Sequence, residues 1–229
     1  RDPLIYRKIK IFFISIIGVA IGFWFYDKLD ISSIHIPFGG DLILGIWFVP
    51  FFVMVMLAVF STSVVDGMDG LAGGIMSLIY LAFAVIAYFH NQIDISALCA
   101  VISGGTLAFL WFNIPPARFY MGETGMVGLT VTLAVIAFLT NSVLILPIIA
   151  VPLVATSFSV IVQIVGYKYF GKRRVFRVAP LHHHFEAIGW SRPKVVMRYW
   201  VITAVFAMVG VILALVSERA LQRVCHRAL

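Results

Sequence analysis

The stretch LAGGIMSLIYLAFAVIAYF, residues 71–89, runs for nineteen residues without a charged side chain. About 20 mostly apolar residues are needed for a helix to cross the hydrocarbon core of a bilayer. This stretch is therefore predicted to be a membrane-spanning helix. It is preceded directly by DGMDG, residues 66–70, which places two carboxylates between glycines at the mouth of a span. Acids at a membrane edge are costly and usually functional.

The composition of the whole chain agrees with this stretch. The 229 residues are 62% hydrophobic and 12% charged, with a mean hydropathy of +1.05. A soluble domain carries about 25% charged residues, so a soluble globular protein is excluded. The net charge of +7 reflects basic cytoplasmic loops in a membrane protein more often than a nucleic-acid site, and no nucleic-acid partner is expected. Cys99 and Cys225 match no disulfide or zinc spacing.

Seven stretches are long and apolar enough to span, which predicts an all-α, polytopic transmembrane helix bundle. They are residues 9–26, 42–60, 71–89, 95–112, 126–140, 143–167 and 199–217. The sixth contains Pro147 and Pro152, which predict a kink or a break. We expect a single membrane domain over residues 1–217 and a poorly ordered tail over residues 218–229.

The orientation follows from the basic residues, which concentrate on the cytoplasmic side of membrane proteins. If the first span begins in the cytoplasm, only four of the 17 Lys and Arg residues lie outside: Lys28, Arg219, Arg223 and Arg227. The loops at 61–70, 113–125 and 168–198 are then cytoplasmic. They hold the unusual polar stretches of the chain, and the outside loops hold nothing comparable. One cytoplasmic site is therefore predicted.

In the first loop, Asp66 and Asp69 lie three residues apart beside glycines, which let a backbone approach a ligand closely. A helix that begins near Leu71 would point its first N–H groups at this loop, an arrangement that favours phosphate. The alternative is a solvated turn in which aspartate caps the helix.

In the second loop, Glu123 lies between Gly122 and Gly125, just before a span. A carboxylate there suits Mg²⁺, which prefers oxygen ligands. The alternative is an acid that the helix dipole favours. Asn113 precedes two prolines and is either an amide donor to a ligand or an ordinary turn residue.

In the third loop, His182, His183 and His184 are consecutive. Successive helical residues are turned by about 100°, so three adjacent imidazoles cannot share one helical face, and we expect an irregular segment that lines a pocket. Zinc ligands are usually spaced by two to five residues, which disfavours zinc. A phosphate ligand or proton carrier fits better, and a solvated, pH-sensitive loop is the alternative. Arg177 upstream either binds substrate phosphate or anchors the membrane face.

Together these stretches resemble the phospho-N-acetylmuramoyl-pentapeptide transferase family, within the polyprenyl-phosphate N-acetylhexosamine-1-phosphate transferase superfamily. DGMDGLAGG resembles its Asp-Gly-Leu-Asp-Gly-Leu-Ala stretch, and WFNIPPARFYMGETG resembles its Phe-Asn-x-x-Pro-Ala…Met-Gly-Asp-Thr-Gly stretch. PLHHHFE is the most specific match, because relatives that transfer N-acetylglucosamine phosphate carry a differently spaced histidine motif. The resemblance covers residues 5–217.

The resemblance implies transfer of phospho-N-acetylmuramoyl-pentapeptide from its UDP-linked donor to undecaprenyl phosphate, giving lipid I and UMP, with Mg²⁺. It implies a multi-pass protein of the bacterial plasma membrane that acts at the cytoplasmic face in peptidoglycan synthesis, and so in cell shape and cell division. It also implies a homodimer. Asp69 matches a family acid important for activity, and Glu123 takes the place of the Mg²⁺-ligating Asp. The roles implied are catalytic for Asp66, Asp69, His182, His183 and His184, and substrate-binding for Ser63 and Asn113.

The sequence departs from the family at three points. Ser63 stands where Asn is usual, Glu123 stands where Asp is usual, and the family's adjacent Asp-Asp pair is absent. That pair belongs to an upstream part with three further spans of a ten-span fold, so we expect little or no transferase activity from this chain alone.

Three alternative functions remain. One is a superfamily enzyme that uses UDP-N-acetylglucosamine as donor, and another is a non-catalytic membrane scaffold. A transporter with a proton relay is disfavoured, because the polar residues cluster at one face and no internal repeat is visible.

Overall fold

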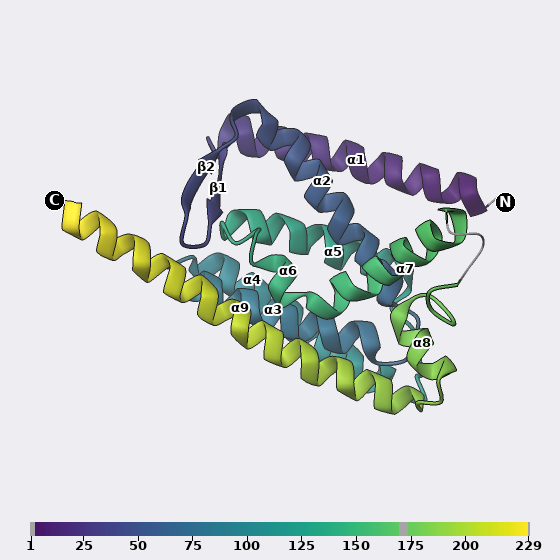
Figure 1. The fold of residues 1–229 in the computed structure, drawn as a ribbon. Coiled ribbons are helices and arrows are strands. Elements are labelled where there is room, and N and C mark those ends of the chain that lie inside the picture. The colour runs from purple at the N-terminus through teal and green to yellow at the C-terminus, as the bar shows by residue number, and fades with distance from the viewer. Residues whose placement is uncertain (1–2, 170–173, 229) are drawn as a thin grey trace.

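The structure, a computed structural model, describes residues 3–169 and 174–228, with side chains at residues 5, 8–169 and 174–219. Within that part of the chain, seven helices are long and apolar enough to cross a membrane, which confirms the predicted all-α polytopic bundle (Figure 1). Six of them are α1 (Pro3–Lys28), α3 (Leu71–Phe89), α4 (Ile93–Asn113), α5 (Gly122–Leu139), α7 (Val151–Tyr169) and α9 (Arg192–Ala228). The remaining span, Gly45–Val65, consists of α2 (Phe48–Ser61) and the 3-10 turns at its two ends, η1 (Gly45–Trp47) and η2 (Thr62–Val65).

The break predicted in the sixth span is present. The segment divides into the single turn α6 (Leu146–Ile149) and α7, with Ala150 between them outside helical geometry. Pro152 has no N–H to continue the ladder at this point. The last span differs at its end, because the backbone of α9 continues as helix to Ala228. The predicted poor order of residues 218–229 is not tested and stays a prediction.

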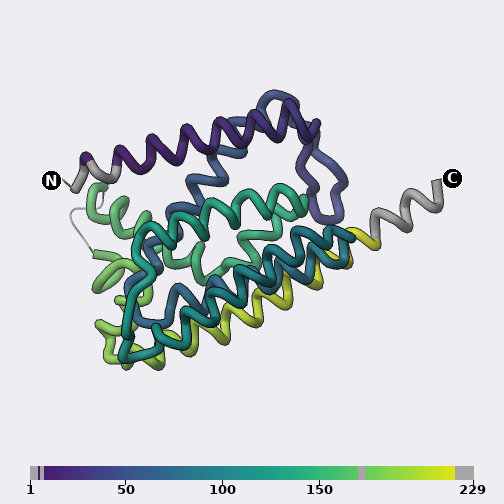
Figure 2. Tube along the Cα trace, turned by 180° about the vertical axis from the view of Figure 1, so that it is seen from behind, coloured from purple at the N-terminus to yellow at the C-terminus, as the bar shows by residue number. Residues whose placement is uncertain are grey.

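A β-hairpin that the sequence analysis missed links α1 to α2. Strands β1 (Ser33–Ile36) and β2 (Gly40–Ile43) pair antiparallel, with His35 opposite Asp41. The hairpin lies at the opposite end of the bundle from the short helix α8 (Leu181–Ala187) and the start of α1 (Figures 1 and 2). We call these the hairpin end and the site end.

Helix α3 forms the centre of the bundle. It packs against α4 on one side and α9 on another, while α1, α2 and α5 form a second group (Figures 1 and 2). Of the α3 span, 78% is buried, against 22–39% for the other six spans. The helix that the predicted site depends on is therefore the one most tightly fixed by its neighbours.

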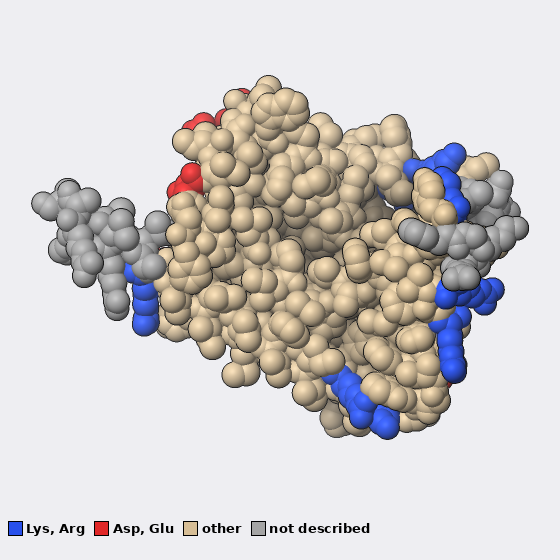
Figure 3. Space-filling view, in the orientation of Figure 1, with Lys and Arg blue, Asp and Glu red and all other residues tan. Residues whose placement is uncertain are grey.

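The charged side chains gather at the two ends. On the face shown in Figure 3, most Lys and Arg atoms lie at the site end, Asp and Glu atoms lie near the hairpin, and the surface between them is almost free of charge. A charge-free belt between charged ends is what a bilayer requires.

Candidate active site

The first two predicted loops are joined by hydrogen bonds at the site end. The backbone N–H of Gly70 donates to Asn113 Oδ1 at 2.8 Å, and Asn113 Nδ2 donates to the Phe119 carbonyl at 2.9 Å. Asp69 Oδ2 accepts a bond from the Ala117 N–H at 3.3 Å. Asn113 is buried, and both polar atoms of its amide have backbone partners. Asn113 therefore positions the two loops relative to one another. The predicted contact of Asn113 with substrate stays a prediction.

Helix α3 begins at Leu71, close to the predicted point, and its cap is conformationally demanding. Gly70 has φ +79°, a left-handed conformation that favours glycine. Trp200 of α9 donates its indole N–H to the Gly70 carbonyl at 3.1 Å. The indole reaches this carbonyl by passing over Gly74, where any Cβ would collide with it.

The three histidines are brought to this loop by a helix. The expectation of an irregular segment is wrong, because residues 182–184 lie in α8. Adjacent imidazoles do point in different directions on a helix, as expected, but this does not exclude a helix. In α8 the three rings point in different directions and contact different residues. His182 is fully buried against Gly67, where an added Cβ would lie 2.7 Å from its Nε2.

His182 is a neutral imidazole in this setting. Neither ring nitrogen has a hydrogen-bond partner among the described residues. Burial, together with the neighbouring His183, lowers the pKa of His182 to about 4. It therefore offers one donor and one acceptor near the Asp66–Asp69 loop, and no positive charge at neutral pH.

His183 is oriented by a carboxylate. Its Nδ1 lies 3.2 Å from Glu186 Oε2, and Glu186 Oε1 accepts a 2.7 Å bond from Arg192 Nε. The hydrogen bonds from Arg192 and from His183 hold the pKa of Glu186 below its ordinary value. The other ring nitrogen of His183 faces Gly67, where a Cβ would lie 3.0 Å away. The sequence analysis gives Glu186 of PLHHHFE no role. Its position three residues after His183 is the pattern that could have indicated contact between the two side chains on a helix.

His184 and Arg177 lie apart from this group. The Arg177 N–H donates to His184 Nδ1 at 3.2 Å, and its guanidinium donates to the Ala187 carbonyl at 3.2 Å. Gln163 of α7 holds the preceding residue by bonding both the N–H and the carbonyl of Phe176. The structure therefore uses Arg177 and His184 to fold the loop over α8 and does not bring them to Asp66.

A cleft of about 770 Å³ opens beside the loop. Its charged residues are Lys10, Asp66 and Glu123, and three serines, Ser61, Ser63 and Ser157, add polar groups. Its apolar wall comes from α1, α2, η2, α5 and α7: Ile11, Leu57, Phe60, Val64, Met126, Val127, Val160 and Ile161. Burial raises the pKa of Asp66. The cleft therefore combines a charged end with a long apolar surface.

Lys10 is a second functional candidate, after Glu186, that the sequence analysis missed. It forms an ion pair with Glu123 across the cleft. In the sequence it was counted only as one more basic residue near a membrane face, and no local pattern connects two residues that are 113 positions apart.

The donor set suits one kind of metal. Among the residues that the structure describes, no group of three or more His, Cys, Asp or Glu side chains could hold a metal ion. Magnesium differs from zinc in being held by one or two carboxylates, with waters and substrate phosphates completing the shell. Asp66 and Glu123 line the same cleft and fit that requirement.

Comparison with known proteins identifies the family of this chain. Residues 5–141, more than half of it, match the family model described as Glycosyl transferase family 4. The chain belongs to glycosyl transferase family 4. The matched region contains Asp66, Asp69, Asn113 and Glu123.

Several curated relatives of this glycosyl transferase family 4 chain share one name. It is similar to the phospho-N-acetylmuramoyl-pentapeptide-transferase of Chloroflexus aurantiacus, at 38% identity over 80% of this chain and 52% of the relative. The proteins of that name from Geobacillus sp. and Listeria monocytogenes serotype 4b are 39% and 37% identical over 84% and 87% of this chain. The chain corresponds to 60% and 63% of their lengths. These matches confirm the family resemblance, and the chain spans about half to two thirds of these relatives.

Proposed function

We propose that this family member acts in the transfer of phospho-N-acetylmuramoyl-pentapeptide from its UDP-linked donor to undecaprenyl phosphate. The products are lipid I and UMP, formed at the cytoplasmic face of the bacterial plasma membrane. The observation that carries the proposal is the cleft, because it joins two carboxylates to an apolar wall at one end of a membrane bundle. The names of the relatives supply the donor.

The apolar wall suits the lipid substrate. Leu57, Phe60 and Ile161 would contact the isoprenoid chain, which places its phosphate at the polar part of the cleft, beside Ser63 and Asp66. The phosphate oxygen then attacks the sugar-linked phosphorus of the donor, and the bond to the UMP oxygen breaks. Holding both groups in one cleft makes the reaction effectively unimolecular.

The charged residues of the cleft would stabilise the phosphates. Magnesium, held by Asp66 and Glu123, would supply positive charge to phosphate oxygens. Lys10 is placed to exchange its bond to Glu123 for a bond to phosphate. Asp69 keeps the second loop in place through Ala117.

The two inner histidines complete the arrangement. His182 is neutral and would offer a ligand one hydrogen-bond donor without adding charge. His183, held by Glu186, presents its second nitrogen at Gly67.

Binding of the donor tests this function without requiring turnover. The purified chain should bind UDP-N-acetylmuramoyl-pentapeptide in the presence of Mg²⁺, and UDP-N-acetylglucosamine should compete weakly. Equal competition would favour the alternative donor, and binding of neither would favour a non-catalytic scaffold. Formation of labelled lipid I from undecaprenyl phosphate, measured in parallel, tests the transfer step, for which little or no product is expected from this chain alone.

A further inference from the structure

Helix α7 presents two different faces to the rest of the bundle. Ser157, Val160 and Ile161 line the cleft. Successive helical residues are turned by about 100°, which places Ser159 and Gln163 on a different side of α7 from these three. That second side faces the segment that carries the histidines, and α8 itself packs against both α7 and α9 (Figure 1). One helix therefore forms part of the cleft wall and part of the support for the histidines.

The side chain of Ser159 reaches the first residue of α8. Its Oγ accepts the Leu181 N–H at 3.0 Å and donates to the Thr156 carbonyl in its own helix at 2.6 Å. Ser159 is only 2% exposed, so water does not compete for these bonds. The hydroxyl is therefore held in one direction by α7 and accepts its hydrogen bond from α8.

The start of α8 has no capping side chain of its own. The first N–H groups of a helix lack partners inside the helix and are often satisfied by a side chain at the cap. In α8 the cap residue is Pro180, which makes no side-chain hydrogen bond. Ser159, 22 positions before Leu181 in the chain, supplies the acceptor instead. The position of the start of α8 therefore depends on α7.

A second side chain of α7 holds the segment that leads into α8. Gln163 bonds the N–H of Phe176 at 2.9 Å and the carbonyl of Phe176 at 3.2 Å. Residues four apart share a helix face, so Gln163 and Ser159 act on the same segment. Helix α7 therefore fixes this segment at Phe176 and again at Leu181.

The two inner histidines depend on this anchor. His182 directly follows Leu181, and neither of its ring nitrogens has a hydrogen-bond partner among the described residues. His183 is bonded to Glu186, which belongs to the same short helix. The place of both rings relative to the Asp66–Asp69 loop is therefore set by the way α8 as a whole is held.

The other end of α8 is held less firmly. Arg192 of α9 donates to Glu186, but the arginine side chain is 70% exposed, and water screens such a bond. The bond from Leu181 to Ser159 is buried, and a buried donor that loses its partner carries the full cost of desolvation. Ser159 is therefore the stronger of these two attachments.

We propose that Ser159 is a positioning residue for donor binding, which fixes the start of α8 and so holds His182 and His183 against the Asp66–Asp69 loop. Ser159 acts through the histidines, since it lies outside the cleft lining and its hydroxyl is engaged with Leu181 and Thr156. The consequence for the donor rests on the proposed function. The effect on α8 is a property of the fold and can be measured without donor.

Hydrogen–deuterium exchange of the purified full chain measures the anchor. Ser159→Ala removes the acceptor of the Leu181 N–H, so the amides of residues 181–187 should exchange about fivefold faster. The amides of residues 66–70, which the two histidines cover, should also exchange faster. Ser77→Ala is the matched control. Ser77 is a buried serine of α3 that bonds the carbonyl three residues before it, and its loss should leave residues 181–187 unchanged.

Binding of the two substrates shows whether the anchor positions the histidines. Ser159→Ala should weaken Mg²⁺-dependent binding of UDP-N-acetylmuramoyl-pentapeptide about fivefold. It should leave the affinity for undecaprenyl phosphate unchanged, because the residues that line the cleft lie on another face of α7. A substitution that merely disturbed the packing of α7 would weaken both.

Three results would overturn the proposal. They are unchanged exchange of residues 181–187 in Ser159→Ala, faster exchange with unchanged donor affinity, and an equal loss of affinity for both substrates. If the unaltered chain binds no donor, the proposed function fails, and exchange at residues 181–187 and 66–70 decides the role of Ser159 by itself.

Discussion

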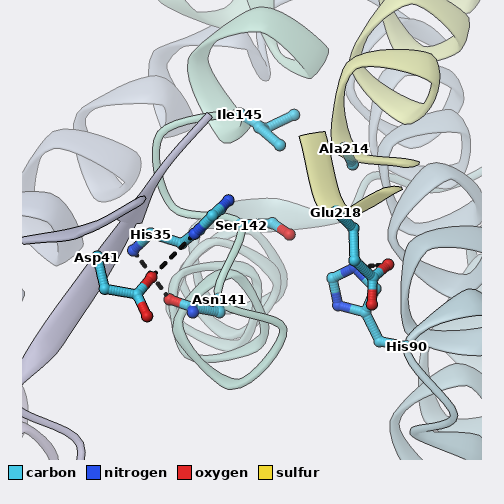
Figure 4. A pocket seen from close by; sticks show the side chains of 8 residues that line it. All are labelled: His35, Asp41, His90, Asn141, Ser142, Ile145, Ala214 and Glu218. Carbon is cyan, nitrogen blue, oxygen red and sulfur yellow. Dashed lines mark hydrogen bonds and ion pairs between the residues drawn. The ribbon is translucent and has the colours of Figure 1, made fainter. Parts of the chain in front are cut away.

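The two ends of the bundle use the same residue types in different ways. At the site end, Asp66 and Glu123 line a cleft of about 770 Å³ together with Lys10 and a long apolar wall. At the hairpin end, Asp41 and Glu218 are paired with His35 and His90 around a cavity of about 230 Å³ (Figure 4). The difference shows that imidazoles and carboxylates alone do not define a site. Their surroundings decide what they contact: a lysine and an apolar wall at one end, and histidines at the other.

The sharpest test of the contrast removes a carboxylate from the cleft. Glu123→Gln should weaken Mg²⁺-dependent donor binding roughly a hundredfold, because the variant loses a metal ligand and the partner of Lys10. Calorimetric titration of the donor with and without Mg²⁺ measures the effect. Glu218→Gln is the matched change at the hairpin end and should leave donor binding intact. If both variants bind donor equally well, the cleft is not the donor site.

The next test concerns the glycine that admits Trp200. Gly74→Ala forces the indole away from α3 and breaks its bond to Gly70, which should cost about 1–3 kcal/mol. For a chain of this size, the unfolding temperature should fall by several degrees. Gly105→Ala in α4, where an added Cβ meets nothing within 4 Å, is the control. An equal shift in the two variants would contradict the described contact.

The buried histidine predicts a pH dependence with a definite sign. The pKa of His182 falls from 6.5 to about 4 on folding, so between these values the unfolded chain binds a proton that the folded chain does not. Stability should therefore fall as pH falls through this window, by about 2 kcal/mol at pH 5. Unfolding temperatures at pH 7 and pH 5 measure the slope.

The control for this pH effect lies in the same helix. His182→Gln should flatten the slope, whereas His184→Gln, whose ring is partly exposed, should not. A slope that survives the first substitution would show that another group titrates.

The smallest expected effect is at Glu186. Because its carboxylate is partly exposed and its bond to Arg192 is screened by water, Glu186→Gln should change stability by less than about 1 kcal/mol. The same substitution removes the acceptor that orients His183. The free energy of donor binding should therefore change more than the free energy of unfolding. Unfolding temperature and donor affinity of one preparation separate the two. Parallel losses would mean that Glu186 only stabilises α8.

The sequence predicted the membrane spans and the position of the polar loops at one end of the bundle, because both depend on local composition. Apolar length marks a span, basic residues mark a side, and the Asp66–Asp69 loop stands out against the apolar run that follows. The hairpin was missed because each strand has only four residues, too few for a clear alternation. The Lys10–Glu123 pair and the contact of His182 with Gly67 depend on which helices become neighbours. Helical spacing alone does not contain that information.

The contact between Trp200 and Gly70 also makes α9 a connection between the two ends of the bundle. Helix α9 continues about 27 Å beyond Trp200 to Glu218, at about 1.5 Å per residue. The indole bonds α9 to the Asp66–Asp69 loop at one end, and Ser217 and Glu218 bond it to the hairpin and to His90 at the other. Any tilt of α9 in a bilayer of different thickness would therefore act on both ends of the bundle at once.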